Sequence, residues 1–206
     1  MMRSTVVHRK PGGPSEAFQQ AVALYRQGRF HEAEPLYQIV LETEVRHFES
    51  LFHLGLIKLQ QNKFDTAADL FRRAAKIERK SADAHHFLGV ALTGLGRPIE
   101  AIRRYKKALA IRPEFAEAHN NLGYTLQMLG QMEEAIAHYQ KALALRPMYS
   151  EARNNLGNAL QMLGRSEEAI AQYEKVIAAK PDDTVAYTSL GNVLGARPSR
   201  RGDRAV

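Results

Sequence analysis

Two nearly identical stretches decide the fold of this chain. "AHNNLGYTLQMLGQMEEAIAHYQKALALRP" runs from Ala118 to Pro147, and "ARNNLGNALQMLGRSEEAIAQYEKVIAAKP" runs from Ala152 to Pro181. They lie 34 residues apart, and the 34-residue segments that contain them share 20 residues. Repetition at a fixed period is the signature of an array of similar structural units that stack on their neighbours. Shared residues that packing requires predict the fold, and shared residues that packing does not require predict the function.

The same period extends over most of the chain. Five full repeats and the start of a sixth align without gaps, beginning at Pro14, Phe48, Ala82, Ala116, Ser150 and Thr184. Each full repeat holds two stretches whose apolar residues lie three or four positions apart, which predicts two helices. The sixth repeat holds one such stretch. We therefore predict an all-α array of antiparallel helix pairs over residues 14–195, with five repeats and a single C-terminal capping helix. We expect disordered basic tails at 1–13 and 196–206.

Recurring small residues and helix breakers support this division. A residue that tolerates a left-handed backbone follows each predicted first helix: Gly28, Asn62, Gly96, Gly130 and Gly164. Prolines follow three of the second helices: Pro113, Pro147 and Pro181. Glycine or alanine recurs in the middle of each first helix: Ala21, Gly55, Gly89, Gly123, Gly157 and Gly191. We expect the two helices of a repeat to approach closely at these small residues.

These residues resemble a known repeat family. Leu-Gly in the first helix (Leu122–Gly123), alanine and tyrosine in the second (Ala135 and Tyr139) and a closing proline (Pro147) resemble the tetratricopeptide repeat, TPR. The resemblance covers most of the chain. It implies a right-handed superhelical solenoid in which the first helices line a concave groove.

Composition argues against several classes of function. Most of the net charge of +7 lies in the two tails, whereas a nucleic-acid-binding protein more often carries a basic face on its folded domain. The chain has no cysteine and no apolar stretch of the length that spans a bilayer. His85 and His119 occupy equivalent repeat positions, but two histidines without a third ligand make a poor zinc site, so we expect them to pack. We predict a cytoplasmic protein without catalytic residues, metal or cofactor, and without a specific nucleic-acid or membrane partner.

The candidate site is the set of first-helix residues that the resemblance places in the groove. Its C-terminal half is rich in amides and comprises Asn120, Asn121, Tyr124, Gln127, Asn154, Asn155, Asn158, Gln161 and Asn192. Its N-terminal half comprises Phe52, His53, Leu56, His86 and Phe87. A side-chain amide can pair with both polar groups of a peptide bond, so a ladder of amides can hold an extended chain. The alternatives are a solvated surface left by recent duplication and, for the aromatic residues, packing between neighbouring helices.

Three functions compete. The first is a non-catalytic scaffold or adaptor that binds an extended or helical peptide segment in the groove. The second follows from the "NNLG" stretches, which resemble the repeat arm of bacterial O-linked N-acetylglucosamine transferase-like proteins. This resemblance implies that the chain is a substrate-recruiting arm whose catalytic domain is missing or separate. It also implies that Asn121 and Asn155 belong to an asparagine ladder. The third is self-association through the C-terminal end, where Leu190, Val193 and Leu194 are expected to lie partly uncovered. We favour the first.

Overall fold

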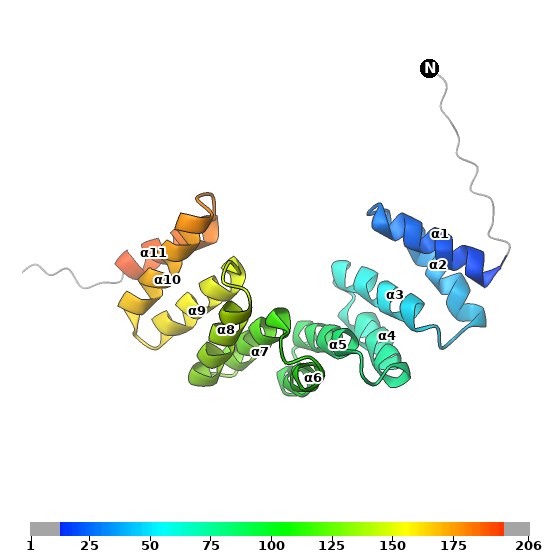
Figure 1. Cartoon of the computed structure of the whole chain (residues 1–206), viewed down its shortest axis with the longest axis horizontal. Helices are drawn as coiled ribbons and strands as arrows, with labels where there is room; N and C mark the ends of the chain where they lie inside the picture. Colours follow the sequence, from blue (N-terminus) through cyan, green and yellow to red (C-terminus); the bar gives the residue numbers. More distant parts are fainter. Residues whose placement is uncertain (1–12, 196–206) are drawn as a thin grey trace, which may run out of the picture. The chain divides into compact units, whose positions relative to one another are not determined.

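The computed structural model describes residues 13–195, and this range contains eleven α-helices and no strand (Figure 1). The predicted all-α fold of five helix pairs and one C-terminal helix is confirmed. The two predicted tails lie almost entirely outside the described residues. The chain divides into two compact parts, with the boundary between Gly96 and Arg97, inside the third repeat.

The N-terminal part contains five helices joined by short turns. They are α1 (Pro14–Arg26), α2 (Phe30–Thr43), α3 (Phe48–Gln60), α4 (Phe64–Ile77) and α5 (Ala82–Gly94). Each helix packs against the next one along the chain, and the first helices α3 and α5 also touch each other. The contact between α3 and α5 means that neighbouring repeats meet through their first helices as well as through the intervening second helix.

The C-terminal part contains six helices. They are α6 (Pro98–Ile111), α7 (Ala116–Met128), α8 (Met132–Leu145), α9 (Ser150–Met162), α10 (Ser166–Ala179) and α11 (Thr184–Gly195). Consecutive helices pack together here too, and α9 contacts both α7 and α11. All six first helices of the chain begin at the residues predicted from the repeat period.

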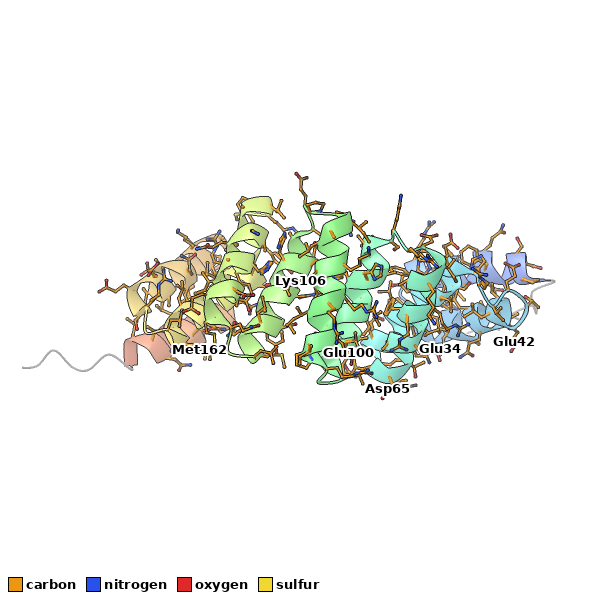
Figure 2. The ribbon with its side chains drawn as sticks, turned by 90° about the horizontal axis from the view of Figure 1, so that it is seen from below. Glu34, Glu42, Asp65, Glu100, Lys106 and Met162 are labelled. Atoms are coloured by element: carbon orange, nitrogen blue, oxygen red, sulfur yellow. The ribbon has the colours of Figure 1, made fainter. Side chains whose placement is uncertain are left out.

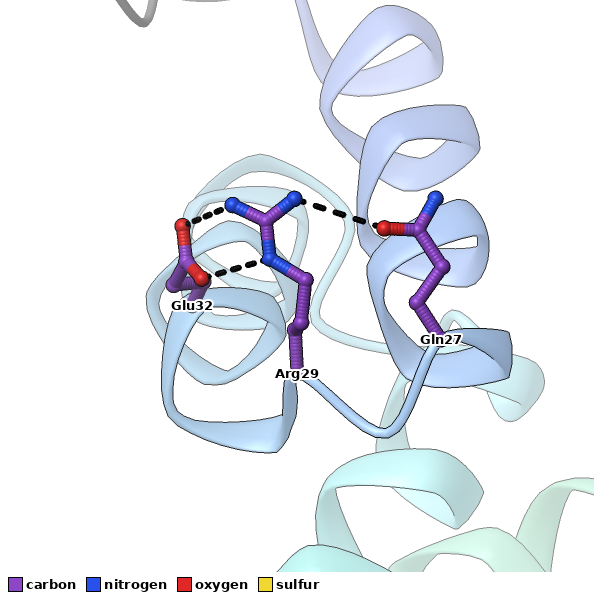
Figure 3. A network of polar contacts seen from close by, with 3 residues as sticks. All are labelled: Gln27, Arg29 and Glu32. Carbon is purple, nitrogen blue, oxygen red and sulfur yellow. Dashed lines mark hydrogen bonds and ion pairs between the residues drawn. The ribbon is translucent and has the colours of Figure 1, made fainter. Parts of the chain in front are cut away.

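The turn that follows each first helix has the backbone conformation that the sequence predicted. Asn62 has a φ of 56°, and the glycines at the equivalent positions have φ between 67° and 77°. The turns are reinforced by ion pairs in three of the repeats. In the first, Arg29 donates to Glu32 on one side and to Gln27 on the other (Figure 3). These side chains are largely exposed, so each pair contributes little to stability.

Aromatic residues of the second helices pack onto the glycines of the first. A Cβ atom built on Gly157 would lie 2.5 Å from Cε1 of Tyr173, and one built on Gly55 would lie 2.8 Å from Cε1 of Phe71. Both rings are fully buried. A glycine inside a helix costs about 1 kcal/mol relative to alanine, and the contact with a buried ring explains why the helix retains it.

Side chains near the start of the first helices tie each repeat to the preceding turn. Nε2 of His119 lies 3.1 Å from the carbonyl oxygen of Pro113, and Nη2 of Arg153 lies 2.5 Å from that of Pro147. The other end of each side chain reaches the second helix of its own repeat, where His119 meets His138 on α8 and Arg153 meets Gln172 on α10. The equivalent His85 likewise lies 3.3 Å from the carbonyl oxygen of Arg79. The predicted packing role of His85 and His119 is confirmed.

One contact in the N-terminal part departs from the apolar pattern of the array. Lys58 on α3 is only 7% exposed, although the equivalent residues of the other repeats are leucines. Its Nζ donates to Oε1 of Glu34 on α2, and Nε2 of Gln61 donates to the other carboxylate oxygen at 2.7 Å (Glu34 is labelled in Figure 2). Burial disfavours the charge on Glu34, but these hydrogen bonds outweigh burial and lower its pKa. Here an ion pair joins two neighbouring repeats.

The last helix is only partly covered. Val193 is 2% exposed, so the expectation that it lies uncovered is wrong, because its side chain faces the body of the C-terminal part. Leu190 is half-buried, whereas Leu194 and Tyr187 are each about half exposed. Among residues 13–195, no atom lies within 4 Å of a Cβ atom built on Gly191, in contrast to the equivalent Gly157. Within this range no aromatic ring packs on α11 at Gly191.

Candidate functional site

The candidate site with the most polar, accessible side chains lies on two neighbouring first helices of the C-terminal part. We call it the α7–α9 face and define it as Asn121, Tyr124, Gln127 and Met128 of α7 and Asn155, Asn158, Gln161 and Met162 of α9. The five amides are half-buried. Tyr124, Met128 and Met162 are 48%, 51% and 63% exposed. The face therefore combines half-buried amides with exposed apolar groups.

The first asparagine of each "NN" pair does not belong to this face. Asn120 is fully buried, and its Nδ2 donates to Oε1 of Glu151 at 2.9 Å. Its Oδ1 accepts from Nδ2 of Asn155 at 3.0 Å. The expectation that Asn120 lines the groove is wrong, because its amide joins α7 to α9.

Asn154 is also buried, and it contacts the residue that precedes α11. It is 7% exposed, and its Nδ2 lies 3.5 Å from Oδ1 of Asp183, which also caps α11 by accepting from the backbone N–H of Ala186 at 3.0 Å. The prediction that Asn154 lines the groove is wrong for the same reason. Asn192, the remaining predicted amide, is exposed on α11.

Two buried tyrosines hold amides of the face in place. The hydroxyl of Tyr139 donates to Oε1 of Gln127 at 2.8 Å, and the hydroxyl of Tyr173 donates to Oδ1 of Asn158 at 2.7 Å. Both tyrosines are fully buried, and burial raises the pKa of each phenol. Because the amide oxygens accept from the tyrosines, the NH₂ groups are the parts left to interact elsewhere. Nε2 of Gln127 lies 3.5 Å from Sδ of Met162, a weak acceptor.

The sequence reasoning missed both methionines of the face. Met128 and Met162 lie at equivalent positions in adjacent repeats, each within the shared letters "LQML". Met162 lies at the C-terminal end of α9 (Figure 2). Their recurrence at equivalent positions is the signal that the sequence offered. Methionine is flexible and polarisable, and it suits surfaces that adapt to a bound chain.

Acidic residues lie at the start of both helices of the face. Glu117 on α7 forms an ion pair with Arg146, and Glu151 on α9 accepts from Asn120. The guanidinium of Arg146 also lies 4.9 Å from the ring centre of Tyr149. Burial, and then the two nearby carboxylates, raise the pKa of Tyr149 to about 12. Arg146 therefore offsets the charge of Glu117, whereas Glu151 accepts from a neutral amide and keeps its negative charge.

The predicted N-terminal half of the site is mainly an aromatic cluster. Phe52 packs against Phe71 and Phe87, with ring centres 5.6 Å apart in each case. His86 is only 4% exposed and lies against Phe87, so the expectation that His86 lines a groove is wrong because packing buries it. His53 stacks on Tyr37 at 5.5 Å. Leu56 is half-buried, as are Phe52, His53 and Phe87. These residues offer less accessible surface than the α7–α9 face.

The described residues also bear on metal binding and on membrane insertion. Between residues 13 and 195, no group of three or more histidine, aspartate or glutamate side chains is placed to hold a metal ion. Over the same residues, no helix combines the length and apolar character needed to cross a membrane.

Comparison with known structures supports the fold. The structure of MamA from residue 41 to its end, from Desulfovibrio magneticus RS-1, matches with a TM-score of 0.75 at 20% identity over 85% of this chain and 99% of that chain. TTC0263, a thermophilic TPR protein from Thermus thermophilus, matches with a TM-score of 0.70 at 24% identity over 88% and 99%. YrrB, described as a TPR protein with an unusual peptide-binding site, matches with a TM-score of 0.70 at 21% identity over 84% and 90%. At these identities the likeness shows the fold.

Comparison with family models identifies the repeats themselves. Models described as tetratricopeptide or TPR repeats match residues 18–85, 95–130 and 114–182, which together make up most of the chain. A comparison with curated protein sequences finds no match. The repeat period, the helix pairs and the three family models agree, and the chain belongs to the tetratricopeptide repeat family.

Proposed function

We propose that this protein is a non-catalytic interaction scaffold that binds a peptide segment of a partner protein at the α7–α9 face. Stacked helical repeats of this kind create extended surfaces that such proteins use for binding. The observation that carries the proposal is the composition of this face, where amides held by buried partners lie beside the exposed Tyr124, Met128 and Met162. Peptide recognition uses the same combination of main-chain hydrogen bonds and apolar side-chain contacts.

One of the similar structures supports the same kind of ligand. YrrB is described as having a peptide-binding site, although that site is called unusual. At 21% identity the likeness supports the class of ligand, a peptide, and not the positions that contact it. The residues that we propose to contact the peptide are those of the α7–α9 face of this chain.

The proposal can be tested by selecting ligands from a displayed library of random linear peptides with the full-length protein. The dissociation constant of an enriched peptide is then measured by fluorescence anisotropy. The face variant is Tyr124→Ala/Met162→Ala, with one exposed residue changed on each helix. The control is Gln140→Ala/Glu174→Ala, two exposed residues at equivalent positions on the second helices α8 and α10. Circular dichroism is used to check that both variants are folded.

We expect the face variant to weaken binding more than about tenfold, since central apolar contacts each cost more than about 1 kcal/mol on truncation. The control should bind within about twofold of the wild type because surface changes away from an interface have small effects. Failure to enrich any peptide would contradict the proposal. Equal affinities of the face variant and the wild type would also contradict it.

A further inference from the structure

The second helix of the third repeat carries a concentration of positive charge that no other second helix has. α6 contains four cationic residues and one acidic residue, whereas each of the helices α2, α4, α8 and α10 contains at least two acidic residues. The four cationic residues are Arg103, Arg104, Lys106 and Lys107. Arg104 is half-buried and the other three are exposed. The charge of α6 therefore lies mainly on its accessible side.

The equivalent stretch of α4 shows how such charges are balanced elsewhere in the chain. Two adjacent arginines of α4 occupy the positions equivalent to Lys106 and Lys107. A guanidinium nitrogen of each lies near a carboxylate oxygen of Asp69, at 3.5 and 4.0 Å. In α6 the position equivalent to Asp69 is occupied by Arg103. α6 therefore has a further cation where α4 has the acid, and like charges three or four positions apart disfavour a helix.

No other feature of the described residues offsets these charges. Glu100 is the one acidic residue of α6, and its Oε1 already accepts from Nε of Arg97 at 2.7 Å (Glu100 and Lys106 are labelled in Figure 2). Within the part of the chain that the structure describes, Arg103, Lys106 and Lys107 form no ion pair. The helix dipole favours cations in the last turn, and the last turn of α6 contains none. The charges are thus left for contacts outside the helix.

The positive charge continues onto α8. Lys141 of α8 is exposed and occupies the position equivalent to Lys107. Burial and the other histidine of the pair, and then Lys141 and Lys106, lower the pKa of His138. Both ammonium groups are therefore close enough to act on the same imidazole. We call this group of cations the α6–α8 basic surface, which comprises Arg103, Lys106, Lys107 and Lys141.

We propose that the α6–α8 basic surface binds an acidic segment of a partner protein. This surface lies on second helices, whereas the α7–α9 face lies on first helices, so the inference does not rest on the proposed peptide site. The guanidinium of Arg103 carries parallel N–H donors that match the two oxygens of a carboxylate. Lys106 and Lys107 lie three and four positions further along, so their ammonium groups flank that guanidinium and attract further carboxylates.

The extent and surroundings of the surface favour a short acidic segment over a nucleic acid. Nucleic-acid-binding proteins commonly make about 6–10 phosphate contacts, whereas the α6–α8 basic surface offers four cations. A long polyanion that followed the second helices beyond this surface would meet carboxylates. α8 and α10 each carry two exposed glutamates in the first turn, and α10 carries a third, the exposed Glu174. A short segment bound at the four cations avoids these groups.

The experiment measures the dissociation constant of a fluorescein-labelled oligoglutamate peptide for the full-length protein, by fluorescence anisotropy at physiological ionic strength. The surface variant is Lys106→Glu/Lys107→Glu. The control is Arg200→Glu/Arg201→Glu, which changes the net charge by the same amount in the basic sequence after α11. Arg103→Glu introduces an acid where α4 has one. Labelled oligoserine and a labelled single-stranded RNA are the comparison ligands, and urea denaturation checks that each variant is folded.

We expect saturable binding of oligoglutamate that Lys106→Glu/Lys107→Glu weakens at least about fourfold, because two attractions at exposed sites are replaced by two repulsions. The control should bind within about twofold of the wild type, since screening beyond a Debye length of about 8 Å limits the effect of net charge alone. Arg103→Glu should weaken binding at least about twofold and leave the urea midpoint unchanged or higher, because it supplies an acid four positions before Lys107. A lower midpoint would show that Arg103 has a structural role instead.

The remaining outcomes separate this surface from other sources of binding. Equal losses in the surface variant and the control would overturn the proposal, because binding would then follow net charge. A lack of saturable oligoglutamate binding would also overturn it. RNA that binds more tightly than oligoglutamate, and that the surface variant releases, would assign the surface to a nucleic acid. The variant Tyr124→Ala/Met162→Ala should bind oligoglutamate like the wild type, so the proposed peptide site and the α6–α8 basic surface can fail independently.

Discussion

Asn155 donates a hydrogen bond to Asn120 at 3.0 Å, which joins the two "NN" pairs of adjacent repeats through their side chains. Asn120 in turn donates a hydrogen bond to Glu151, which lies on the same helix as Asn155. The repeated dipeptide therefore carries two roles. Its first residue is buried and contacts the next repeat, Asn120 through α9 and Asn154 through Asp183, and its second residue lies at the α7–α9 face.

Asn120 and Asn121 should differ in their effect on stability. Asn120→Ala removes a buried amide and leaves Asn155 and Glu151 without one partner, so we expect the free energy of unfolding to fall by about 1–3 kcal/mol. Asn121→Ala truncates a half-buried side chain and should cost about 0.5 kcal/mol or less. Urea denaturation measures both. Equal losses for the two variants would show that the buried linkage is not a significant contact.

The ion pair between Lys58 and Glu34 should behave as a unit. Lys58→Leu introduces the residue found at the equivalent position of the other repeats, yet it leaves the carboxylate of Glu34 beside apolar surface without its cation. We expect this single variant to be destabilised by about 2 kcal/mol, less than for a fully buried pair because Glu34 is only partly buried.

The double variant Lys58→Leu/Glu34→Ile should recover that loss. Isoleucine occupies the position equivalent to Glu34 in the third, fourth and fifth repeats. Replacing both partners of an ion pair by packed apolar residues is often neutral or stabilising by about 1–4 kcal/mol. Thermal and urea denaturation of the two variants give the comparison. A double variant less stable than the single variant would mean that Lys58 and Glu34 do not act as a pair.

The contact between His119 and His138 should make the C-terminal part sensitive to acid. Nδ1 of one ring lies 3.0 Å from Nδ1 of the other, and Nε2 of His119 lies within hydrogen-bonding distance of Pro113. Burial, the His119 ring, and then Lys141 and Lys106 lower the pKa of His138 to about 4. Burial also lowers the pKa of His119.

The sign of the pH dependence follows from these shifts. Between the unfolded pKa of about 6.5 and the folded pKa of about 4 of His138, the unfolded chain binds more protons at this residue, and the lowered pKa of His119 acts in the same direction. The stability that they contribute is therefore complete above pH 6.5 and is lost as the pH falls toward 4. His119→Arg/His138→Gln installs the pair found at the equivalent positions of the fifth repeat, Arg153 and Gln172. Denaturation at several pH values should show a smaller acid loss for this variant, and equal losses would refute the role of the pair.

Two glycines at equivalent repeat positions should respond oppositely to alanine. A Cβ atom at position 157 would lie 2.5 Å from the fully buried ring of Tyr173. Overpacking of this kind costs about 1–3 kcal/mol, so Gly157→Ala should lower the melting temperature. A Cβ atom on Gly191 of α11 would meet no atom of the described part of the chain within 4 Å, and Gly191→Ala should stabilise the helix by up to about 1 kcal/mol. Calorimetry distinguishes the two, and a stabilised Gly157→Ala protein would contradict the packing account.

The sequence predicted the fold well because each repeat restates the same local constraints. The period placed the start of every first helix, and the left-handed turn residues appeared at Asn62 and the four glycines with the expected φ values. These features depend on residues close together in the chain. Because the same pattern occurs five times, each copy supports the assignment of helices in the others.

The site was harder to predict because exposure depends on contacts between repeats. Asn120 and Asn121 are adjacent and chemically identical, yet they point in different directions on the helix, and Asn120 contacts Glu151 and Asn155 of the next repeat. The equivalent His86 and Asn154 are also buried, but their polar side chains are of the kind that a sequence pattern predicts to be exposed. Met162 was missed for the converse reason, because apolar residues in a helix are expected to be buried.

The most direct test of the central claim observes the side-chain amides themselves. An enriched peptide is titrated into the isotopically labelled full-length protein, and the NH₂ resonances of asparagine and glutamine are followed by NMR. The resonances of Gln127 and Asn158 are assigned by substitution, and those of Gln140 on α8 serve as the control. We expect saturable shifts of the Gln127 and Asn158 resonances and no shift of the Gln140 resonances. Saturable binding that leaves both of these resonances unmoved would contradict it.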